Sequence, residues 1–312
     1  MPGRRANIRL TARVYNNGEA SPQHEMPELP EVETIRRDLL DHVVGRTITS
    51  VRIAPGAERV VRGDDAFAQR LAGRRITDVL RRGKYLLFRL DGKGKPRYLA
   101  VHLRMTGSLL FRRASDPPDP YVRAVIALDY GSELRYADLR KLGQLWVVDS
   151  PEEAVGRLGP EPLDAAFTAA KLRDSLSGRR APIKAVLLDQ RAIAGIGNIY
   201  ADEALFAARI HPRRLASSLS EAEVGRLHRA IRRVLNDALD NRGSSFRDYV
   251  DAAGREGTHQ LRVKVFRRTG QPCYVCGAEI ARIKVGGRST HFCPHCQPES
   301  DTDVATTKRR HN

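Results

Sequence analysis

The sequence contains no long apolar run. Its 312 residues include no stretch near the roughly 18 consecutive apolar residues that a transmembrane helix requires, and the mean hydropathy is −0.44. A protein that spans a membrane is therefore excluded. Residues 1–25 also lack the apolar segment of a secretory signal peptide, so we expect a cytoplasmic protein. Apolar residues still make up 41% of the chain, which suffices for a buried core and excludes disorder throughout.

Acidic residues are too few to balance the basic ones. The chain has 54 Lys and Arg against 37 Asp and Glu, a formal net charge of +17. Such an excess is typical of proteins that bind a polyanion, with nucleic acid first and an acidic membrane surface second. A charge that serves only solubility is the remaining alternative. Composition alone indicates nucleic acid without establishing it.

Cysteine is absent outside one short segment. Two Cys-x2-Cys pairs are separated by residues 277–292, which is a spacing typical of tetrahedral zinc. The predicted ligands are Cys273, Cys276, Cys293 and Cys296. Because four thiolates fill the coordination shell, we expect one structural zinc ion without an open position for substrate, and no organic cofactor. His291 and His295 lie close enough in sequence to be minor alternative ligands.

The apolar pattern of the first half changes from helical to extended. Four apolar residues between positions 32 and 43 recur at spacings of three and four, which predicts one helix. Residues 47–149 then contain short apolar runs separated by Gly, Asp and Pro, which favours a β-sandwich. We therefore expect an N-terminal domain over residues 27–150, preceded by an appended extension over residues 1–26.

The second half is predicted to be mainly helical. Asn198 is the expected N-cap of one helix, and Ser220 and Glu223 fit a capping box at the start of the longest one. A proline-containing linker is expected over residues 151–168 and a helical domain over residues 169–261. A small β-rich cysteine unit follows over residues 262–297, and a polar, disordered tail over residues 298–312. The pattern predicts an α+β, multidomain chain.

Several motifs resemble those of one known family. They are residues 26–34 (MPELPEVET), 83–86 (GKYL), 102–109 (HLRMTGSL), 158–163 (LGPEPL), 195–201 (GIGNIYA) and the cysteine unit. In order and spacing, residues 26–297 resemble the formamidopyrimidine-DNA glycosylases, bacterial base-excision repair enzymes for oxidised purines. The resemblance implies an N-terminal β-sandwich with flanking helices, a helix-two-turn-helix domain and a C-terminal zinc-finger β-hairpin. It also implies a monomer in the bacterial nucleoid that binds damaged double-stranded DNA in the cleft between its halves.

The resemblance assigns catalytic roles to four residues. Pro27 maps to the nucleophile, an amino-terminal secondary amine that attacks the deoxyribose C1′ and forms a Schiff base. An α-amino group has a pKa of about 7.8 against about 10.4 for lysine, so it is neutral far more often at pH 7. Glu28 maps to the proton donor that helps to open the sugar, and Lys84 to the acid for β-elimination. Arg288 maps to the residue associated with δ-elimination; because Arg retains its proton, we expect phosphate binding first.

Without the motifs, the same residues have simpler interpretations. Glu28 and Glu31 would be first-turn acids that complement a helix dipole, and for Glu31 we keep that interpretation. Lys84 would be a surface lysine on a strand, and Arg288 would be part of a solvated basic face.

Five further residues map to DNA contacts in the family. They are Met105, Arg140, Arg179, Lys184 and Asn198. Met105 corresponds to the wedge that fills the gap left by an everted base, and Arg140 to the residue that faces the orphaned base. The other three correspond to phosphate contacts. For Asn198 the helix cap is an equally good interpretation, and both can hold.

The chain departs from the family pattern at three positions that concern DNA. Leu139 and Leu142 replace Pro and Phe in the loop that carries Arg140, and Tyr121 replaces a His that contacts DNA. Because Leu142 cannot stack as an aromatic ring does, it loses roughly 1 to 3 kcal/mol per base, and the opposite-base selectivity is not predicted. Residues 243–257 align with the loop that folds over the everted base.

Pro27 follows Met26 in this sequence, so its nitrogen is a tertiary amide without a basic lone pair. Three hypotheses address this. In the preferred one, translation starts at Met26 and that methionine is removed. In the second, a protease trims the extension. In the third, the extension persists and the chain binds damaged DNA without lyase activity.

Two rival functions remain beside the predicted one. An endonuclease VIII-type glycosylase for oxidised pyrimidines is disfavoured by Leu29 and Pro30, because that subgroup usually has Gly-Pro there. A non-catalytic, zinc-containing DNA-binding protein is the rival from another class. We predict a bifunctional DNA glycosylase and AP lyase with β,δ-elimination, acting on oxidised purines such as formamidopyrimidines and 8-oxoguanine.

Overall fold

A computed structural model describes residues 26–92 and 94–299 of the chain. The expectations for the extension before Met26 and for the tail after Glu299 lie outside the described residues. Within the described ranges, no helix combines the length and the apolar character that a membrane crossing demands.

The first half is a sandwich of two antiparallel four-stranded sheets, as predicted. One sheet has the order β1 (Ile48–Ile53), β6 (Val122–Leu128), β7 (Ser132–Asp138) and β5 (Gly107–Arg113). The other has the order β2 (Arg75–Arg82), β3 (Tyr85–Asp91), β4 (Arg97–His102) and β8 (Gln144–Val148). Buried side chains such as Phe88, Ile126 and Tyr136 belong to their common core.

Two helices flank the sandwich. Helix α1 (Leu29–Val43) buries the predicted stripe of Val32, Ile35, Leu39 and Val43 in the sandwich core. Helix α2 (Asp64–Leu71) lies within residues 47–149, where the apolar pattern indicated strands and located no helix. Its two buried side chains, Phe67 and Leu71, are four residues apart, and so short a repeat carries little periodicity in the sequence.

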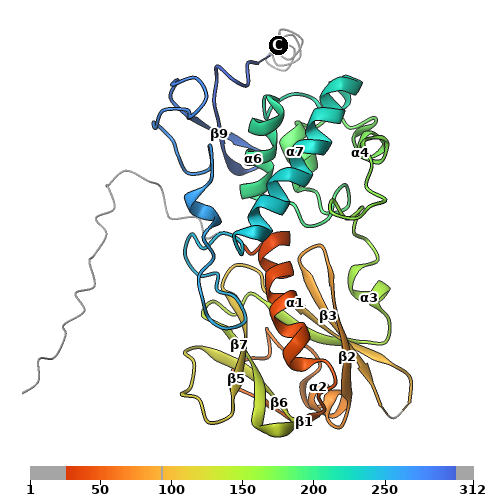
Figure 1. Ribbon diagram of the computed structural model, residues 1–312. Coiled ribbons are helices and arrows are strands. Elements are labelled where there is room, and N and C mark those ends of the chain that lie inside the picture. The colour runs from red at the N-terminus through yellow and green to blue at the C-terminus, as the bar shows by residue number, and fades with distance from the viewer. Residues whose placement is uncertain (1–25, 93, 300–312) are drawn as a thin grey trace, which may run out of the picture.

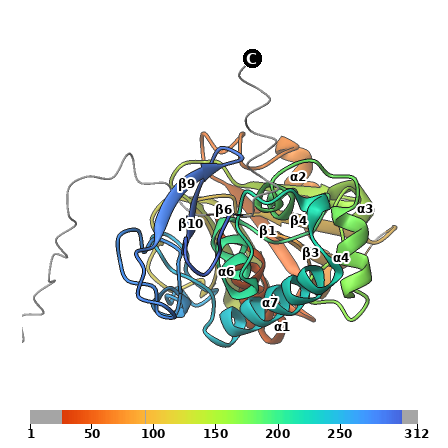
Figure 2. The same cartoon turned by 90° about the horizontal axis from the view of Figure 1, so that it is seen from above.

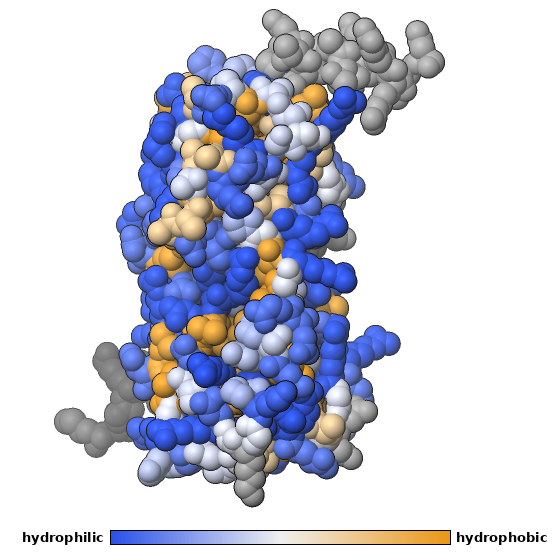
Figure 3. Space-filling model, turned by 90° about the vertical axis from the view of Figure 1, so that its right-hand side faces the viewer, coloured by the Kyte–Doolittle hydropathy of each residue, from blue (hydrophilic) through white to orange (hydrophobic). Residues whose placement is uncertain are grey.

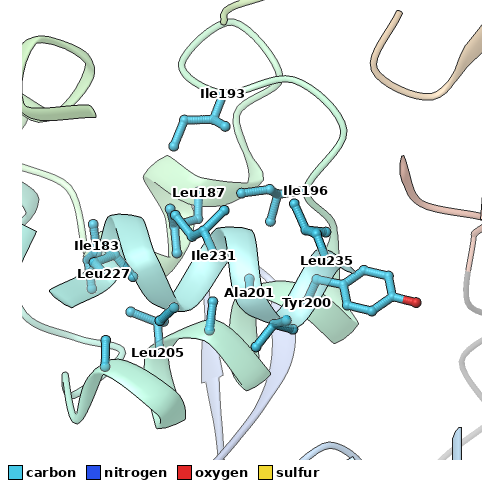
Figure 4. Close-up of a cluster of buried hydrophobic side chains, with 14 of the residues drawn as sticks. Ile183, Leu187, Ile193, Ile196, Tyr200, Ala201, Leu205, Leu227, Ile231 and Leu235 are labelled. Carbon is cyan, nitrogen blue, oxygen red and sulfur yellow. The ribbon is translucent and has the colours of Figure 1, made fainter. Parts of the chain in front are cut away.

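The second half is helical. It contains α3 (Pro151–Val155), α4 (Ala169–Leu176), α5 (Ile183–Leu188), α6 (Asn198–Ala208) and α7 (Glu221–Asp240). The described chain also has short 3-10 helices, η1 (Asp129–Gly131), η2 (Ala216–Ser218) and η3 (His259–Leu261). The predicted capping box of Ser220 and Glu223 is present at the start of α7. Side chains from α5, α6 and α7 meet in one apolar core (Figure 4).

The prediction of Asn198 as a helix N-cap is wrong. Gly197 is the N-cap of α6, and Asn198 is the first residue of the helix. Gly197 has no side chain that could accept hydrogen bonds, so another group must satisfy the free N–H groups of the first turn. The carboxylate of Glu28 does so, as described below.

The cysteine unit carries a β-hairpin, as expected, made of β9 (Ala281–Val285) and β10 (Arg288–Phe292). A small apolar cluster joins this unit to α6, formed by Phe206 of the helix with Val265, Cys273, Ile280 and Cys293. Figure 2 shows the hairpin beside α6, and the two elements are in direct contact.

Helix α1 lies between the two halves (Figure 1). Its first residue, Leu29, is buried in the helical core, whereas its later apolar residues belong to the sandwich core. The segment after α7 crosses in the opposite direction, because its Tyr249 and Ala252 are buried in the sandwich core. The Ala252 carbonyl also accepts a hydrogen bond from the Phe111 N–H of β5 at 2.9 Å. The side of this molecule drawn in Figure 3 is mostly hydrophilic, with apolar residues in small patches.

Candidate active site

A cavity of about 440 Å³ lies where the sandwich, the helical half and the hairpin meet. Its lining includes five of the predicted site residues, which come from distant parts of the sequence. They are Glu28, Lys84, Met105, Asn198 and Arg288. Met26 also contributes to the wall of this cavity.

Glu28 connects α1 to the start of α6. Its side chain is buried, and its carboxylate accepts hydrogen bonds from the N–H groups of Gly197 at 2.7 Å, Ile199 at 2.9 Å and Tyr200 at 3.4 Å. These donors lie at the positive end of the α6 dipole, which favours a negative charge there. The fit is close, because a Cβ atom on Gly197 would lie 2.3 Å from the Glu28 Cδ.

Pro27 is buried beside Glu28. It contributes to a second, much smaller cavity together with Glu31, Ser244 and Tyr249, and Met26 borders both cavities. Pro27 itself is not among the residues that line the larger cavity, whereas Met26 and Glu28, its neighbours in the chain, are.

Glu31 makes more hydrogen bonds than expected of an acid that only complements the helix dipole in the first turn of α1. It is buried, and its carboxylate accepts hydrogen bonds from the Tyr200 hydroxyl at 2.5 Å, the Ser244 N–H at 2.7 Å and the Glu28 N–H at 2.9 Å. Burial raises the pKa of Glu31, against the effect of these hydrogen bonds. Figure 4 shows the Tyr200 hydroxyl pointing away from the apolar cluster. Sequence reasoning missed this link, because Tyr200 and Ser244 are remote from Glu31 in the chain.

Lys84 lies in the turn between β2 and β3 and is buried. Gly83, the residue before it, has a φ of +55°, a conformation that favours glycine. The Gly83 N–H donates a hydrogen bond to the Glu161 carboxylate, which also pairs with Arg81 at 2.7 Å and Arg82 at 2.9 Å. The linker between the halves therefore holds the turn that carries Lys84.

Met105 and Arg140 lie on adjacent turns at the rim of the sandwich. The Arg140 Nη1 is 3.9 Å from the Met105 Sδ. Asp138 fixes both turns, because its Oδ1 accepts hydrogen bonds from the Thr106 hydroxyl at 2.5 Å and the Arg140 N–H at 3.1 Å. Leu142, in the same loop, is 39% exposed and lines the cavity.

The three residues assigned to phosphate contacts lie in different environments. Asn198 lines the cavity, and its Oδ1 is buried with no hydrogen-bond partner among the described residues. Arg179 pairs with Asp189 at 3.1 Å outside the cavity. Lys184 is fully buried, and its Nζ contacts Asp202 at 2.7 Å and the Ser289 carbonyl at 2.8 Å. The structure therefore brings neither Arg179 nor Lys184 into the cleft, and their phosphate contacts stay predictions.

The four cysteines fit a zinc ion. Their Sγ atoms all lie within 4.8 Å of one another, with Cys273 and Cys296 4.0 Å apart and Cys276 and Cys293 3.4 Å apart. Tetrahedral zinc with bonds of about 2.3 Å requires sulfur atoms about 3.8 Å apart. Neither His291 nor His295 belongs to this cluster.

The fold and the cleft define a class of DNA-processing protein built from a β-sandwich, a helical domain and a four-cysteine finger. Family models match along the chain in the same order. The N-terminal domain of formamidopyrimidine-DNA glycosylase matches residues 26–145, its H2TH domain matches residues 158–250, and a zinc finger found in FPG and IleRS matches residues 270–298.

Individual proteins agree with these matches. The formamidopyrimidine-DNA glycosylase of Symbiobacterium thermophilum is 49% identical over 91% of this chain and 93% of its own length, and that of Heliobacterium modesticaldum is 47% identical over 87% and 100%. Among solved structures, a Lactococcus lactis FPG mutant in complex with Fapy-dG DNA has a TM-score of 0.80 at 37% identity, covering 88% of this chain and all of its own. MutM in complex with DNA that contains carbocyclic 8-oxo-G has a TM-score of 0.79 at 37% identity, with the same coverage.

The chain belongs to the formamidopyrimidine-DNA glycosylase family. Its activity is that of a DNA glycosylase for oxidised purines in base-excision repair, in a family characterised by an additional AP lyase activity. The solved Lactococcus lactis relatives hold damaged DNA, with Fapy-dG in one complex and an abasic site in another.

Proposed function

We propose that the form of this chain that begins at Pro27 excises formamidopyrimidines and 8-oxoguanine through a Schiff base on Pro27, and then cleaves the strand by β,δ-elimination. The observation that carries the proposal is the single cavity lined by Glu28, Lys84 and Arg288 beside Pro27. A carboxyl group, an ammonium and a guanidinium from three separate parts of the chain converge there.

The first step requires a free Pro27 nitrogen. Its lone pair forms a bond to the sugar C1′ as the bond from C1′ to the base breaks, and the base leaves with the bonding electrons. The Glu28 carboxylate accepts the proton that the Pro27 nitrogen loses and donates it to the sugar ring oxygen, which opens the ring and leaves an iminium ion on Pro27. The family model begins at residue 26, which supports translation from Met26 followed by removal of that methionine.

The later steps eliminate the two phosphates that flank the sugar. The iminium withdraws electrons, so C2′ loses a proton to water as the bond to the 3′ phosphate breaks in β-elimination. C4′ then loses a proton to water as the bond to the 5′ phosphate breaks in δ-elimination. Lys84 is the proposed acid for the first elimination. Arg288 binds and neutralises the phosphate in the second, since a guanidinium stays protonated.

The DNA around the lesion is held by residues at the cavity rim. Met105 and Arg140 enter the gap left by the everted nucleotide, with Arg140 facing the orphaned base. Asn198, which lines the cavity, donates a hydrogen bond to a phosphate from its side-chain NH2 group. One structural zinc ion, held by the four thiolates, braces the hairpin, and the protein acts as a monomer without an organic cofactor.

Borohydride trapping tests the proposal. The chain that begins at Pro27 is incubated with a duplex containing 8-oxoguanine and sodium borohydride, which reduces the iminium to a stable covalent adduct. We expect an adduct with this form, a strongly reduced yield with Pro27→Gly, and none with the full 312-residue chain. A full yield with Pro27→Gly would contradict the assigned nucleophile. A parallel duplex with oxidised pyrimidines tests the base preference.

The intact mass of the native protein separates the first two hypotheses for the extension, a start at Met26 or trimming by a protease, from the third, in which the extension persists. A native species that lacks residues 1–26 is expected. A native protein that retains them would instead support a damage-binding protein without lyase activity, because the Pro27 nitrogen would remain an amide.

A further inference from the structure

Three buried residues connect α5, α6 and the hairpin that carries Arg288. Lys184 belongs to α5, Asp202 to α6 and His291 to β10. The Lys184 Nζ forms an ion pair with the Asp202 Oδ1 at 2.7 Å. The Asp202 Oδ2 accepts a hydrogen bond from the His291 N–H at 2.8 Å and lies 3.1 Å from the His291 Nδ1. The side chains of Lys184 and Asp202 are fully buried. Neither can therefore contact DNA in this conformation.

These contacts hold the outer edge of β10. In the described sheet β10 pairs only with β9, so its other edge presents backbone groups that no strand satisfies. The Ser289 carbonyl accepts from Lys184 at 2.8 Å, and the His291 N–H donates to Asp202. Two side chains from the helical domain thus bind the two residues on either side of Thr290, itself fully buried.

Arg288 is the first residue of the strand held in this way. The Ser289 carbonyl that Lys184 binds belongs to the next residue, and the Thr290 hydroxyl donates to the Arg288 carbonyl at 3.2 Å. Helix α6 also begins with the N–H groups that hold Glu28, and Asp202 lies about one turn further along it. One helix therefore fixes both the carboxylate and the arginine of the cleft.

We propose that Lys184 and Asp202 are positioning residues for Arg288, which hold β10 on α6 so that the guanidinium faces the cavity. This inference rests on the proposed function, because it needs Arg288 to act in δ-elimination. It gives the buried Lys184 a role that differs from a phosphate contact. A loosened β10 should slow the step that Arg288 serves more than the steps at Pro27, because a misplacement of about 1 Å is costly for catalysis.

The test compares two readouts on a duplex with an abasic site. Borohydride trapping reports Schiff-base formation at Pro27, and the ratio of δ-elimination to β-elimination products reports the action of Arg288. For Lys184→Met and Asp202→Asn we expect the product ratio to fall on the order of tenfold, with a smaller fall in trapping per folded molecule. Zinc content and thermal midpoint establish the folded fraction, and Asp202→Asn is the near-isosteric variant should Lys184→Met fold poorly.

A double variant identifies the route of the effect. If Lys184 acts through Arg288, the variant with both Lys184→Met and Arg288→Gln has the same product ratio as Arg288→Gln alone. Arg135→Met removes a buried cation that pairs with Asp119 in the sandwich, and as a matched control it should leave the ratio unchanged.

Two results would overturn the inference. A wild-type product ratio in both Lys184→Met and Asp202→Asn would show that they do not position Arg288, and a further fall in the double variant would show that Lys184 acts independently of it. All variants are made in the chain that begins at Pro27, and failure of that chain without further substitution to form any adduct would instead contradict the proposed function.

Discussion

The β-sandwich and the zinc finger present their cleft residues by different means. In the sandwich, Lys84, Met105 and Arg140 lie on turns that connect strands of one large apolar core. In the finger, Arg288 starts a two-stranded hairpin whose apolar cluster is small. The finger is fixed instead by its thiolates and by buried acids of α6. Its position depends on a few polar interactions with α6, whereas the turns of the sandwich combine the polar contacts of Glu161 and Asp138 with attachment to a large shared core.

The two acids of α6 illustrate this dependence. Asp202 holds β10, as described above. The next residue, Glu203, accepts hydrogen bonds from the N–H groups of Lys264 at 2.8 Å, Val265 at 2.9 Å and Phe266 at 2.9 Å. Both the strand that carries Arg288 and the segment that enters the finger are therefore attached to adjacent residues of one helix.

Loss of the metal should give the largest difference in effect between the zinc finger and the β-sandwich. In Cys276→Ser/Cys293→Ser, we expect zinc content near zero and a fall in duplex binding on the order of 100-fold or more, because a unit this small needs the metal to fold. The sandwich should keep its thermal transition, since its core does not include the finger. His295→Ala, at an exposed position outside the cysteine cluster, is the matched control and should retain zinc. Loss of the sandwich transition in the cysteine variant would contradict the contrast.

The junction between the regions should tolerate no added methyl group at Gly197. In Gly197→Ala the Cβ would lie 2.3 Å from the Glu28 Cδ, so Glu28 must leave the α6 N-terminus. We expect a loss of about 1 to 3 kcal/mol in the free energy of unfolding and a fall in trapping rate on the order of 100-fold. Gly225→Ala, in α7, has only the Arg229 Nη1 near its Cβ at 3.6 Å and should gain about 0.5 to 1 kcal/mol. Equal trapping rates for the two variants would show that Glu28 does not need this position.

The same contrast explains what could be predicted from the sequence. The zinc ligands and the apolar stripe of α1 follow local spacing, so residue types at fixed intervals were enough to find them. Glu28 at the N-terminus of α6 was not predictable from pattern, because its partners are about 170 residues away and Asn198 offered a plausible local cap. The burial of Lys184 likewise depends on tertiary contacts. Its neighbours in the sequence do not indicate that it packs against Asp202 and β10.

Polar interactions in the sandwich should have a smaller effect, visible as a dependence on pH. Glu33 of α1 pairs with Arg36 at 2.8 Å and Arg81 at 3.0 Å. Burial alone would raise the pKa of Glu33, but the hydrogen bond from Arg36 and the charges of Arg36 and Arg81 lower it to about 2. Its stabilising contribution is therefore fully present above the unfolded pKa near 4.5 and is lost as the pH falls towards 2.

We expect Glu33→Gln to lose about 2 kcal/mol in the free energy of unfolding at pH 7, after allowance for solvent screening. Denaturant titrations from pH 7 to pH 2 should show this difference from wild type shrinking to zero. Glu153→Gln, at an exposed position in α3, should stay within about 0.5 kcal/mol of wild type at every pH. A difference for Glu33→Gln that does not change with pH would rule out the ion pairs as its cause.

The smallest effect is expected at the rim of the sandwich, where a side chain can change without disturbing the core. Leu142 is partly exposed and lines the cavity, whereas Leu139, in the same loop and 49% exposed, does not line it. Leu142→Phe should tighten binding to an abasic duplex by roughly 1 kcal/mol through stacking on a base, with the free energy of unfolding unchanged within about 0.5 kcal/mol. Leu139→Phe should change neither quantity. Equal gains from both variants would mean that added apolar surface, and not stacking at the cavity, accounts for the affinity.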